Sequence, residues 1–214
     1  MNYGLPYQGS KNRIARRLVD ALPPAPVLYD VFCGGCAVTH AAMLSGKYQH
    51  FVINDRRGWL PDAFQKAIHG GYAHEDRWIS HEDFERLKNL ECPQTDESLC
   101  RLQSLERLER INSTAVPPVL TVTTGDYRAL EFYRPGIIYC DPPYKSTEER
   151  YGRDFDFDDF YAWCEHQANP VFISEYTMPE DRFLPVAAFT VTRKMDARKS
   201  SICPEKIWRP RTQL

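Results

Sequence analysis

Residues 136–144, with the sequence GIIYCDPPY, constrain the fold of this 214-residue chain more than any other segment. The first five residues are a short apolar run, which is typical of a buried parallel strand. The two prolines end the ladder of strand hydrogen bonds, because proline has no N–H and a fixed φ. The strand is therefore followed by the carboxylate of Asp141, a free carbonyl at Pro142 and the ring of Tyr144. Since open α/β sheets bind ligands at the carboxyl ends of their strands, we expect a flat heterocycle with an amino group to bind here.

Strand-like and helical patterns alternate along the chain. The helix that begins at Ser10 is expected to stop at the proline pair 23–24. Two further runs, 189–193 and 207–208, predict a terminal antiparallel pair. The alternation predicts an α/β fold with a mostly parallel, doubly wound sheet, built as one domain over residues 1–214. The predicted strands are 27–32, 51–54, 119–123, 137–140 and 171–174, and the predicted helices are 10–21, 37–44, 58–69, 80–90 and 157–167.

One stretch, residues 99–111, does not fit this alternation. Between Leu99 and Ile111 an aliphatic residue recurs every three positions. On an α-helix such a stripe would wrap about 240° around the axis in four steps, which is too wide for one buried face. A bent helix, two short helices and irregular structure all remain open. We expect residues 59–115 as a whole to form a small, mainly helical insertion.

Composition limits the class of protein. Apolar residues make up 43% of the chain, which is ordinary for a globular fold, and no apolar run reaches the ~18 residues that a membrane-spanning helix needs. The first residues lack the apolar core of a signal peptide, so we expect a cytoplasmic protein without a membrane partner, and a monomer. The seven cysteines are odd in number and mostly isolated, which favours reduced thiols over a disulfide framework.

Metal and redox chemistry are not favoured. The segment 33–36 is formally C-x-x-C, but no second cysteine pair completes a zinc site, and the six histidines show no metal-ligand spacing. We expect no metal. A redox pair is conceivable, but we expect these two cysteines to pack as small residues in a turn.

Charge is distributed unevenly along a chain whose net charge is −2. Residues 1–20 contain four basic residues and one acid, and residues 193–211 contain seven basic residues and two acids. These basic ends could frame a face that binds phosphates, although solvated surface charge often clusters in this way. The residues that we expect to contact phosphates are Lys11, Arg198 and Lys199.

A glycine turn follows the first strand, in the sequence LYDVFCGGCA of residues 28–37. Glycines at this point let the backbone approach a ligand closely. Asp55 ends the second strand, 21 residues after Gly34, at the spacing of the acid that binds ribose hydroxyls in nucleotide-binding folds. The full G-x-G-x-x-G pattern is absent, which favours a nucleoside without phosphates. A chance glycine pair and strand-end aspartate is the alternative explanation.

Two weaker patterns lie at the same predicted edge of the sheet or before it. Asp126 follows the third strand and could accept a hydrogen bond from an amino group, while Tyr127 could pack on a ring, although an ordinary polar turn would look the same. Lys11 follows Ser10, a helix cap, and could serve a carboxylate or a DNA phosphate.

Taken together, these motifs resemble the Dam-type DNA adenine-N6 methyltransferases, in a compact phage- or prophage-like form. They occur in the family's order over nearly the whole chain except about residues 59–115. The residues that resemble the cofactor-binding motifs are Tyr7, Lys11, Asp30, Phe32, Gly34, Asp55, Asp126 and Tyr127. Asp141, Pro142 and Tyr144 resemble the catalytic motif, and residues 174–176 and 205–208 resemble a later strand and the terminal hairpin.

This resemblance implies a Rossmann-like fold and transfer of a methyl group from S-adenosyl-L-methionine to the exocyclic N6 of adenine. The substrate would be double-stranded DNA with the target base flipped out of the helix. Asp141 and the Pro142 carbonyl would accept hydrogen bonds from the amine, and Tyr144 would stack on the base. Methylation of cytosine N4 or of protein glutamine would need the same acceptors, but those relatives more often carry Ser or Asn before the two prolines. A relative that binds DNA without turnover is a further alternative.

The chain departs from the family pattern at two places. Cys36 stands where the family usually has a further glycine, which should crowd the turn slightly. The insertion at residues 59–115 is short for a target-recognition region, so it could be a reduced one. The DNA sequence that such an enzyme would recognise does not follow from these motifs.

Overall fold

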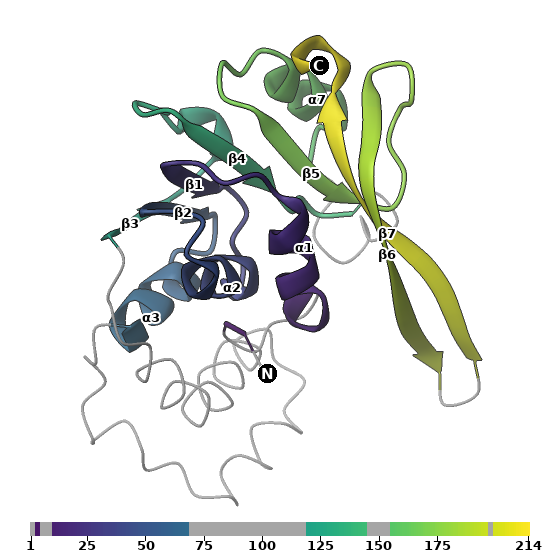
Figure 1. Ribbon diagram of the computed structural model, residues 1–214, viewed down its shortest axis with the longest axis horizontal. Helices are drawn as coiled ribbons and strands as arrows, with labels where there is room; N and C mark the ends of the chain where they lie inside the picture. The colour runs from purple at the N-terminus through teal and green to yellow at the C-terminus, as the bar shows by residue number, and fades with distance from the viewer. Residues whose placement is uncertain (1–2, 5–9, 69–118, 145–154, 197–198) are drawn as a thin grey trace, which may run out of the picture.

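The structure, a computed structural model, describes residues 3–4, 10–68, 119–144, 155–196 and 199–214. These residues form one seven-stranded sheet with the order β3-β2-β1-β4-β5-β7-β6 (Figure 1). The chain runs outward from β1 to β3 and then returns to place β4 beside β1, so the topological switch point lies between β1 and β4. The predicted doubly wound, mostly parallel sheet is confirmed. Its parallel strands are β1 (Val27–Asp30), β2 (His50–Asp55), β3 (Val119–Thr124), β4 (Gly136–Cys140) and β5 (Val171–Glu175).

The terminal antiparallel pair is confirmed and is much longer than predicted. It consists of β6 (Phe183–Asp196) and β7 (Lys199–Pro210). The later strand, β7, lies between β5 and β6 and is antiparallel to both. In Figure 1 the hairpin extends well beyond the other strands. The amino-terminal half of β7 therefore passes the carboxyl end of β5, where ligand sites of such sheets lie.

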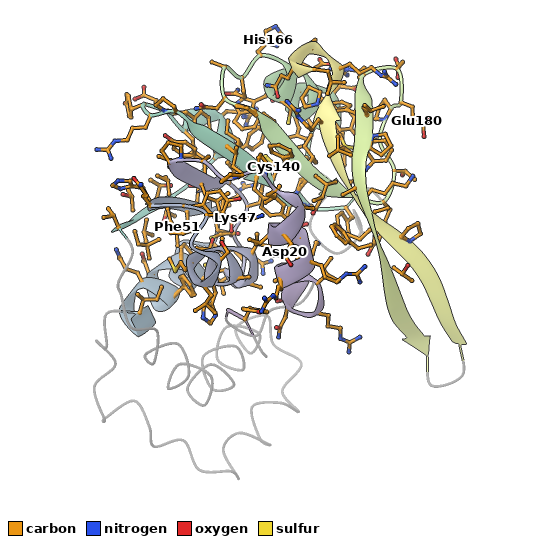
Figure 2. All side chains as sticks on the ribbon, in the orientation of Figure 1. Asp20, Lys47, Phe51, Cys140, His166 and Glu180 are labelled. Carbon is orange, nitrogen blue, oxygen red and sulfur yellow. The ribbon has the colours of Figure 1, made fainter. Side chains whose placement is uncertain are left out.

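Helices cover both faces of the sheet, with α1 (Ala15–Ala21), α2 (Ala37–Ser45) and α3 (Trp59–Ile68) on one face and α7 (Phe157–Glu165) on the other (Figure 1). Alternate residues of β4 serve the two layers: Ile137 and Tyr139 pack with α1 and α2, whereas Ile138 and Cys140 pack with α7. Figure 2 labels Cys140, which lies near the middle of the sheet. Because both faces are covered, the sequence of this strand is continuously apolar.

The helix predicted at 10–21 divides into two parts, a 3-10 turn η1 (Lys11–Arg13) and α1. The Ser10 hydroxyl accepts a hydrogen bond from the Asn12 N–H at 3.4 Å, so it caps η1 as expected. At the other end, the Lys47 ammonium group donates to three carbonyls of the last turn of α1 and the residue after it, at 2.8 to 2.9 Å; Figure 2 labels Lys47 and Asp20 of this end. Lysine at this place satisfies carbonyls that a helix end leaves unpaired.

The helices predicted at 37–44, 58–69 and 157–167 are confirmed within two residues at each end. Short 3-10 turns also occur as η3 (Tyr127–Ala129) and η5 (Arg211–Gln213). The helix predicted at 80–90, the three-residue repeat at 99–111 and most of the predicted insertion at 59–115 lie outside the described residues. Within the described ranges, no helix is both long and apolar enough to cross a bilayer.

Candidate active site

The predicted site segments follow β1, β2, β3 and β4, and they meet at the carboxyl edge of the sheet. Asn54, the buried residue before the end of β2, joins three of these exits. Its side-chain amide donates to the carbonyls of Val31 and Gly125, both at 3.1 Å. Its main-chain carbonyl accepts from the Cys33 N–H at 2.9 Å. The turn after β1 is therefore held in register with the ends of β2 and β3.

Asp55 holds the glycine turn through its side chain. Gly34 has a φ of 47°, a left-handed conformation that glycine adopts readily, and its N–H donates to Asp55 Oδ2 at 2.9 Å. Asp55 Oδ1 accepts from the Arg57 N–H at 2.8 Å. Burial raises the pKa of Asp55, and these two N–H donors oppose that rise. The carboxylate is half-buried at the sheet edge, where an acceptor for ribose hydroxyls was predicted.

Replacing Asp55 by alanine should weaken binding of S-adenosyl-L-methionine by about tenfold or more, because the turn loses its anchor and the site loses a charged acceptor. Isothermal titration calorimetry would measure the dissociation constant. Asp62→Ala, which removes an exposed carboxylate on α3, is the matched control. An unchanged dissociation constant in Asp55→Ala would remove Asp55 from the cofactor site.

Asp30, at the end of β1, has a carboxylate oxygen that no described residue contacts through a hydrogen bond. Its side chain is almost fully buried, Oδ2 accepts from the Thr39 hydroxyl at 2.5 Å, and Oδ1 has no hydrogen bond among the described residues. Burial raises the pKa of Asp30 to about 7. A buried acceptor without a donor is uncommon in a finished core and suits a ligand that brings one. S-adenosyl-L-methionine carries an ammonium group, so Asp30, the glycine turn and Asp55 fit the cofactor that the resemblance implies.

Cys36 occupies a backbone position that favours glycine. Its φ of 57° and ψ of 30° are left-handed, a conformation that costs a residue with a side chain about 1–2 kcal/mol. This is the position where the family usually has glycine, so the expected crowding takes the form of backbone strain. Both Cys33 and Cys36 are free thiols, and burial raises the pKa of each. Because the thiolate is the reactive form, these pKa values favour packing in the turn over redox chemistry.

The amino-terminal residues Tyr3 and Gly4 pack directly on the glycine turn. The Gly4 N–H donates to His40 Nδ1 at 3.0 Å, and a Cβ at Gly4 would lie 2.3 Å from the Gly35 carbonyl oxygen. Burial lowers the pKa of His40 to about 4, so this ring is a neutral acceptor at neutral pH. Tyr7, the next predicted cofactor residue, lies outside the described residues.

The catalytic motif forms a cluster with Lys11 and Glu205. Lys11 Nζ lies 2.7 Å from Asp141 Oδ1 and 3.7 Å from Glu205 Oε1, and it also donates to the Tyr144 hydroxyl. That hydroxyl in turn donates to Glu205 Oε1 at 2.5 Å. The side chains of Lys11 and Glu205 are 7% and 3% exposed, whereas that of Asp141 is 20% exposed. Lys11 and Glu205 are therefore buried, whereas Asp141 and Tyr144 of the catalytic motif are half-buried.

The environment of Lys11 bears on its two predicted roles. Burial by itself would lower the pKa of Lys11, but the carboxylates of Asp141 and Glu205 outweigh burial and raise it. Burial raises the pKa of Asp141, and the charge of Lys11 opposes that rise. Lys11 thus remains charged inside the protein with two carboxylates beside it. This arrangement favours the role of a carboxylate partner over contact with a DNA phosphate.

The ring of Tyr144 contacts both Tyr176 and Lys11. Its centroid lies 4.7 Å from that of Tyr176 with an interplanar angle of 55°, and Lys11 Nζ lies 4.4 Å from the same centroid. Tyr176 follows β5, so the exits of β4 and β5 contribute adjacent rings. Such a pair offers apolar, polarisable surface for a base beside the carboxylate of Asp141.

Asp126 and Tyr127 also lie at the carboxyl edge, but both already have partners. Asp126 is exposed, caps η3 and forms an ion pair with Arg128 at 2.7 Å, which lowers the pKa of Asp126 to about 2. The buried ring of Tyr127 packs against Phe32 at 5.3 Å and Trp163 at 5.1 Å. Phe32 and Tyr127 were both predicted to contact the cofactor. Phe32 is half-buried, so its ring is more accessible than that of the buried Tyr127.

No role was predicted from the sequence for Glu205 or Tyr176. Each lies in a segment that was noted only for its resemblance to a family motif. One signal for Glu205 was present: it lies two residues before Ile207 on the same strand, so both side chains point to the same, buried face. A carboxylate at a core-facing position needs a cation or a donor. Nothing in the sequence identified Lys11 as that cation.

The predicted phosphate contacts are only partly described. Arg198 lies outside the described residues, and Lys199 begins β7. No group of three or more histidine, cysteine or acidic side chains in the described ranges is arranged to hold a metal ion.

Comparisons with known proteins bear on the family. The model of the D12 class N6 adenine-specific DNA methyltransferases matches residues 7–98, which include Lys11, the glycine turn and Asp55 and end before Asp141. No curated protein matches the sequence significantly.

Among solved structures, the rRNA methyltransferase AviRa from Streptomyces viridochromogenes is 17% identical, with 97% of this chain and 86% of that chain covered and a TM-score of 0.47. The C-terminal domain of precorrin-6Y C5,15-methyltransferase from Rhodobacter capsulatus is 10% identical, with 97% and 93% covered and a TM-score of 0.47. Both scores are below 0.5, so these two similarities carry no argument about the site. The resemblance predicted from the motifs, to the N6 adenine-specific DNA methyltransferases, is confirmed by the family match over residues 7–98.

Proposed function

We propose that this protein transfers a methyl group from S-adenosyl-L-methionine to the exocyclic N6 of adenine in DNA. The observation that carries the proposal is the position of Asp141. Its partly exposed carboxylate stands at the carboxyl end of β4, beside the switch point of the sheet, with the glycine turn of β1 on the neighbouring strand. The family match over residues 7–98 supports adenine N6 as the methyl acceptor.

Asp30, Gly34 and Asp55 would hold the cofactor at the edge of β1 and β2. When bound there, S-adenosyl-L-methionine would supply an electrophilic methyl group on a sulfonium, which leaves as a neutral thioether. Asp30 would accept a hydrogen bond from the ammonium group through Oδ1, and Asp55 would accept from the ribose hydroxyls. Because Asp55 also fixes Gly34, cofactor binding and turn geometry would depend on the same side chain.

Asp141 would act on the amine. The lone pair of N6 is delocalised into the adenine ring, so the nitrogen is a weak nucleophile. Hydrogen bonds from its two hydrogens to Asp141 and the Pro142 carbonyl would favour a tetrahedral nitrogen with a localised lone pair. After the N–CH₃ bond forms, the nitrogen is positively charged and loses one proton to Asp141 or to solvent. Positioning of the amine would supply most of the rate enhancement.

The target adenine would have to leave the duplex, since a base inside the helix cannot reach this corner. Extrusion costs a few kcal/mol of unstacking. Stacking on Tyr144, itself held by Tyr176 and Lys11, would offset part of that cost. The rigid support of this ring is therefore expected to favour the flipped state.

Three arginines on η1 and α1 supply a phosphate-binding face next to this corner. Arg13, Arg16 and Arg17 are exposed, follow one another at helical spacing on one side, and form no ion pair with the other described residues. Arg17 lies over the ring of Phe189 on β6, at 5.3 Å from its centroid, so the face continues toward the hairpin. Arg13 is two residues from Lys11. Guanidinium groups here would meet the phosphates that flank a base placed at Asp141.

Replacing Arg13, Arg16 and Arg17 together by glutamine should reduce the salt dependence of DNA binding. Each phosphate contact in duplex DNA contributes about 0.9 to the slope of log K against log salt concentration, so the slope should fall by about 2 to 3. Fluorescence anisotropy at several salt concentrations would measure it. Arg134→Gln, an exposed arginine before β4 at the opposite edge of the sheet, should leave the slope unchanged. Equal slopes for the parent and the triple variant would remove this face from the DNA interface.

Incubation of the protein with unmethylated DNA and methyl-labelled cofactor, followed by mass analysis of the nucleosides, tests the function directly. N6-methyl-2′-deoxyadenosine among the products is the expected result. N4-methyl-2′-deoxycytidine would identify cytosine as the methylated base instead, and no labelled nucleoside at any enzyme concentration would refute the proposal.

A further inference from the structure

Glu205 has no part in the proposed chemistry, yet it is the most completely enclosed carboxylate at the catalytic corner. It lies on β7, where Lys206 pairs with Glu175 in the antiparallel register with β5. This pairing brings Glu205 beside the exits of β4 and β5. There it accepts from the Tyr144 hydroxyl and lies 3.7 Å from Lys11 Nζ. Burial of this carboxylate, whose side chain is 3% exposed, costs free energy that the contacts with Lys11 and Tyr144 must offset.

The charges of the cluster do not cancel. Among these three side chains, Lys11 contributes one positive charge, and the ionised carboxylates of Asp141 and Glu205 contribute one negative charge each, so the three together sum to −1. With Asp141 alone, Lys11 would form a neutral pair, and much of the negative potential at the catalytic carboxylate would be lost. Glu205 offers Lys11 a second anion. The carboxylate that faces the amine can therefore remain a strong acceptor while its partner cation stays satisfied.

We propose that Glu205 is a positioning residue, which orients Tyr144 through its hydroxyl and shares the charge of Lys11 so that Asp141 keeps a net negative field at the amine. The inference rests on the proposed function. Methyl transfer leaves a positive charge on the nitrogen, and a cluster with net negative charge stabilises that charge as it forms. Charges inside a protein interact appreciably beyond contact distance, so Glu205 can act on the amine without touching it.

The Glu205→Gln variant tests this role, because glutamine keeps the size of the side chain and an oxygen that accepts from Tyr144 but removes the charge. Single-turnover methyl transfer should slow by about tenfold or more, with the affinity for S-adenosyl-L-methionine within twofold of the parent. The acid limb of the pH–rate profile should move to lower pH, because loss of a neighbouring negative charge makes Asp141 easier to ionise. Lys206→Gln is the matched control, since Lys206 is the next residue on β7, faces the other side and packs on Trp208.

A second readout needs no activity. Denaturation midpoints of the parent, Lys11→Met, Glu205→Gln and the double variant form a double-mutant cycle. If Lys11 and Glu205 interact directly, the effects of the two changes on stability are coupled. The double variant should lose less stability than the sum of the losses in the two single variants, because each single change leaves a buried charge with fewer partners.

Additive losses in the cycle would overturn the inference, and so would a Glu205→Gln enzyme with the parent's rate and pH profile. A slower variant with an unshifted profile would reduce Glu205 to a structural residue. A parent protein that transfers no methyl group to DNA would refute the proposed function and this role with it. An active parent with an unaffected variant would refute only the role of Glu205.

Discussion

Asp141→Asn should slow methyl transfer to DNA by about 100- to 1,000-fold, the usual loss when a preorganised charged group at a reacting centre is removed. The neutral amide is a weaker acceptor for the amine, and its NH₂ group can point at the amine and repel it. The change also leaves Lys11 with Glu205 as its remaining carboxylate in the cluster. Single-turnover assays with labelled cofactor would measure the rate. Asp141→Ala should abolish the reaction altogether.

Cofactor affinity separates this catalytic role from a general loss of the site. Asp141 follows β4, whereas the residues that would hold the cofactor lie at the carboxyl ends of β1 and β2, so the dissociation constant of S-adenosyl-L-methionine should stay within a few-fold of the parent value. Asp62→Asn, which neutralises an exposed carboxylate on α3, should change neither quantity. If Asp141→Asn methylates DNA at the parent rate, Asp141 is not the catalytic acceptor.

Much of the fold was predictable because its information is local. The run at 136–140 is apolar throughout since both faces of β4 are covered, and the prolines at 142–143 end the strand wherever it lies in the sheet. The end of α2 at Gly46 follows from the left-handed conformation of that residue. Gly34, Asp55 and Asp141 each lie at or just after the end of a predicted strand, and parallel strands share one carboxyl edge. Their meeting at the same edge was therefore predictable as well.

The contacts that define the corner were not predictable, because they join residues far apart in the chain. Lys11 and Asp141 are separated by 130 positions, and no local pattern indicates that this lysine, among the basic residues near the amino terminus, would be buried. The position of β7 between β5 and β6 decides where Glu205 lies, and strand order is set by packing across the whole sheet. Tyr127 looked like a ligand-facing ring, but a cluster of aromatic side chains, including Phe155 and Trp163, surrounds it.

Asp30→Asn should remove a large pH dependence from the stability of the protein. The pKa of Asp30 is about 7 in the folded protein and about 3.8 in the unfolded chain, so the folded state holds this proton more tightly. Its contribution to stability is therefore fully present below pH 3.8 and is lost as the pH rises toward 7. At about 1.4 kcal/mol per pH unit, the parent should lose about 4 kcal/mol across this window. Asparagine does not titrate, so the variant should lack this slope.

Urea denaturation at pH 4, 5.5, 7 and 8 would measure the effect. At pH 8 the variant should be more stable than the parent by about 1–3 kcal/mol, because part of the gain is offset by a buried NH₂ group where Oδ1 has no partner among the described residues. Thr39→Val removes the hydroxyl that donates to Asp30 and holds its pKa down, so it should extend the loss of stability to higher pH. Asp20→Asn should keep the parent's slope. If Asp30→Asn keeps that slope as well, the pH dependence of stability arises from other groups. Asp30 is then not a buried carboxyl group with a raised pKa beside the cofactor turn.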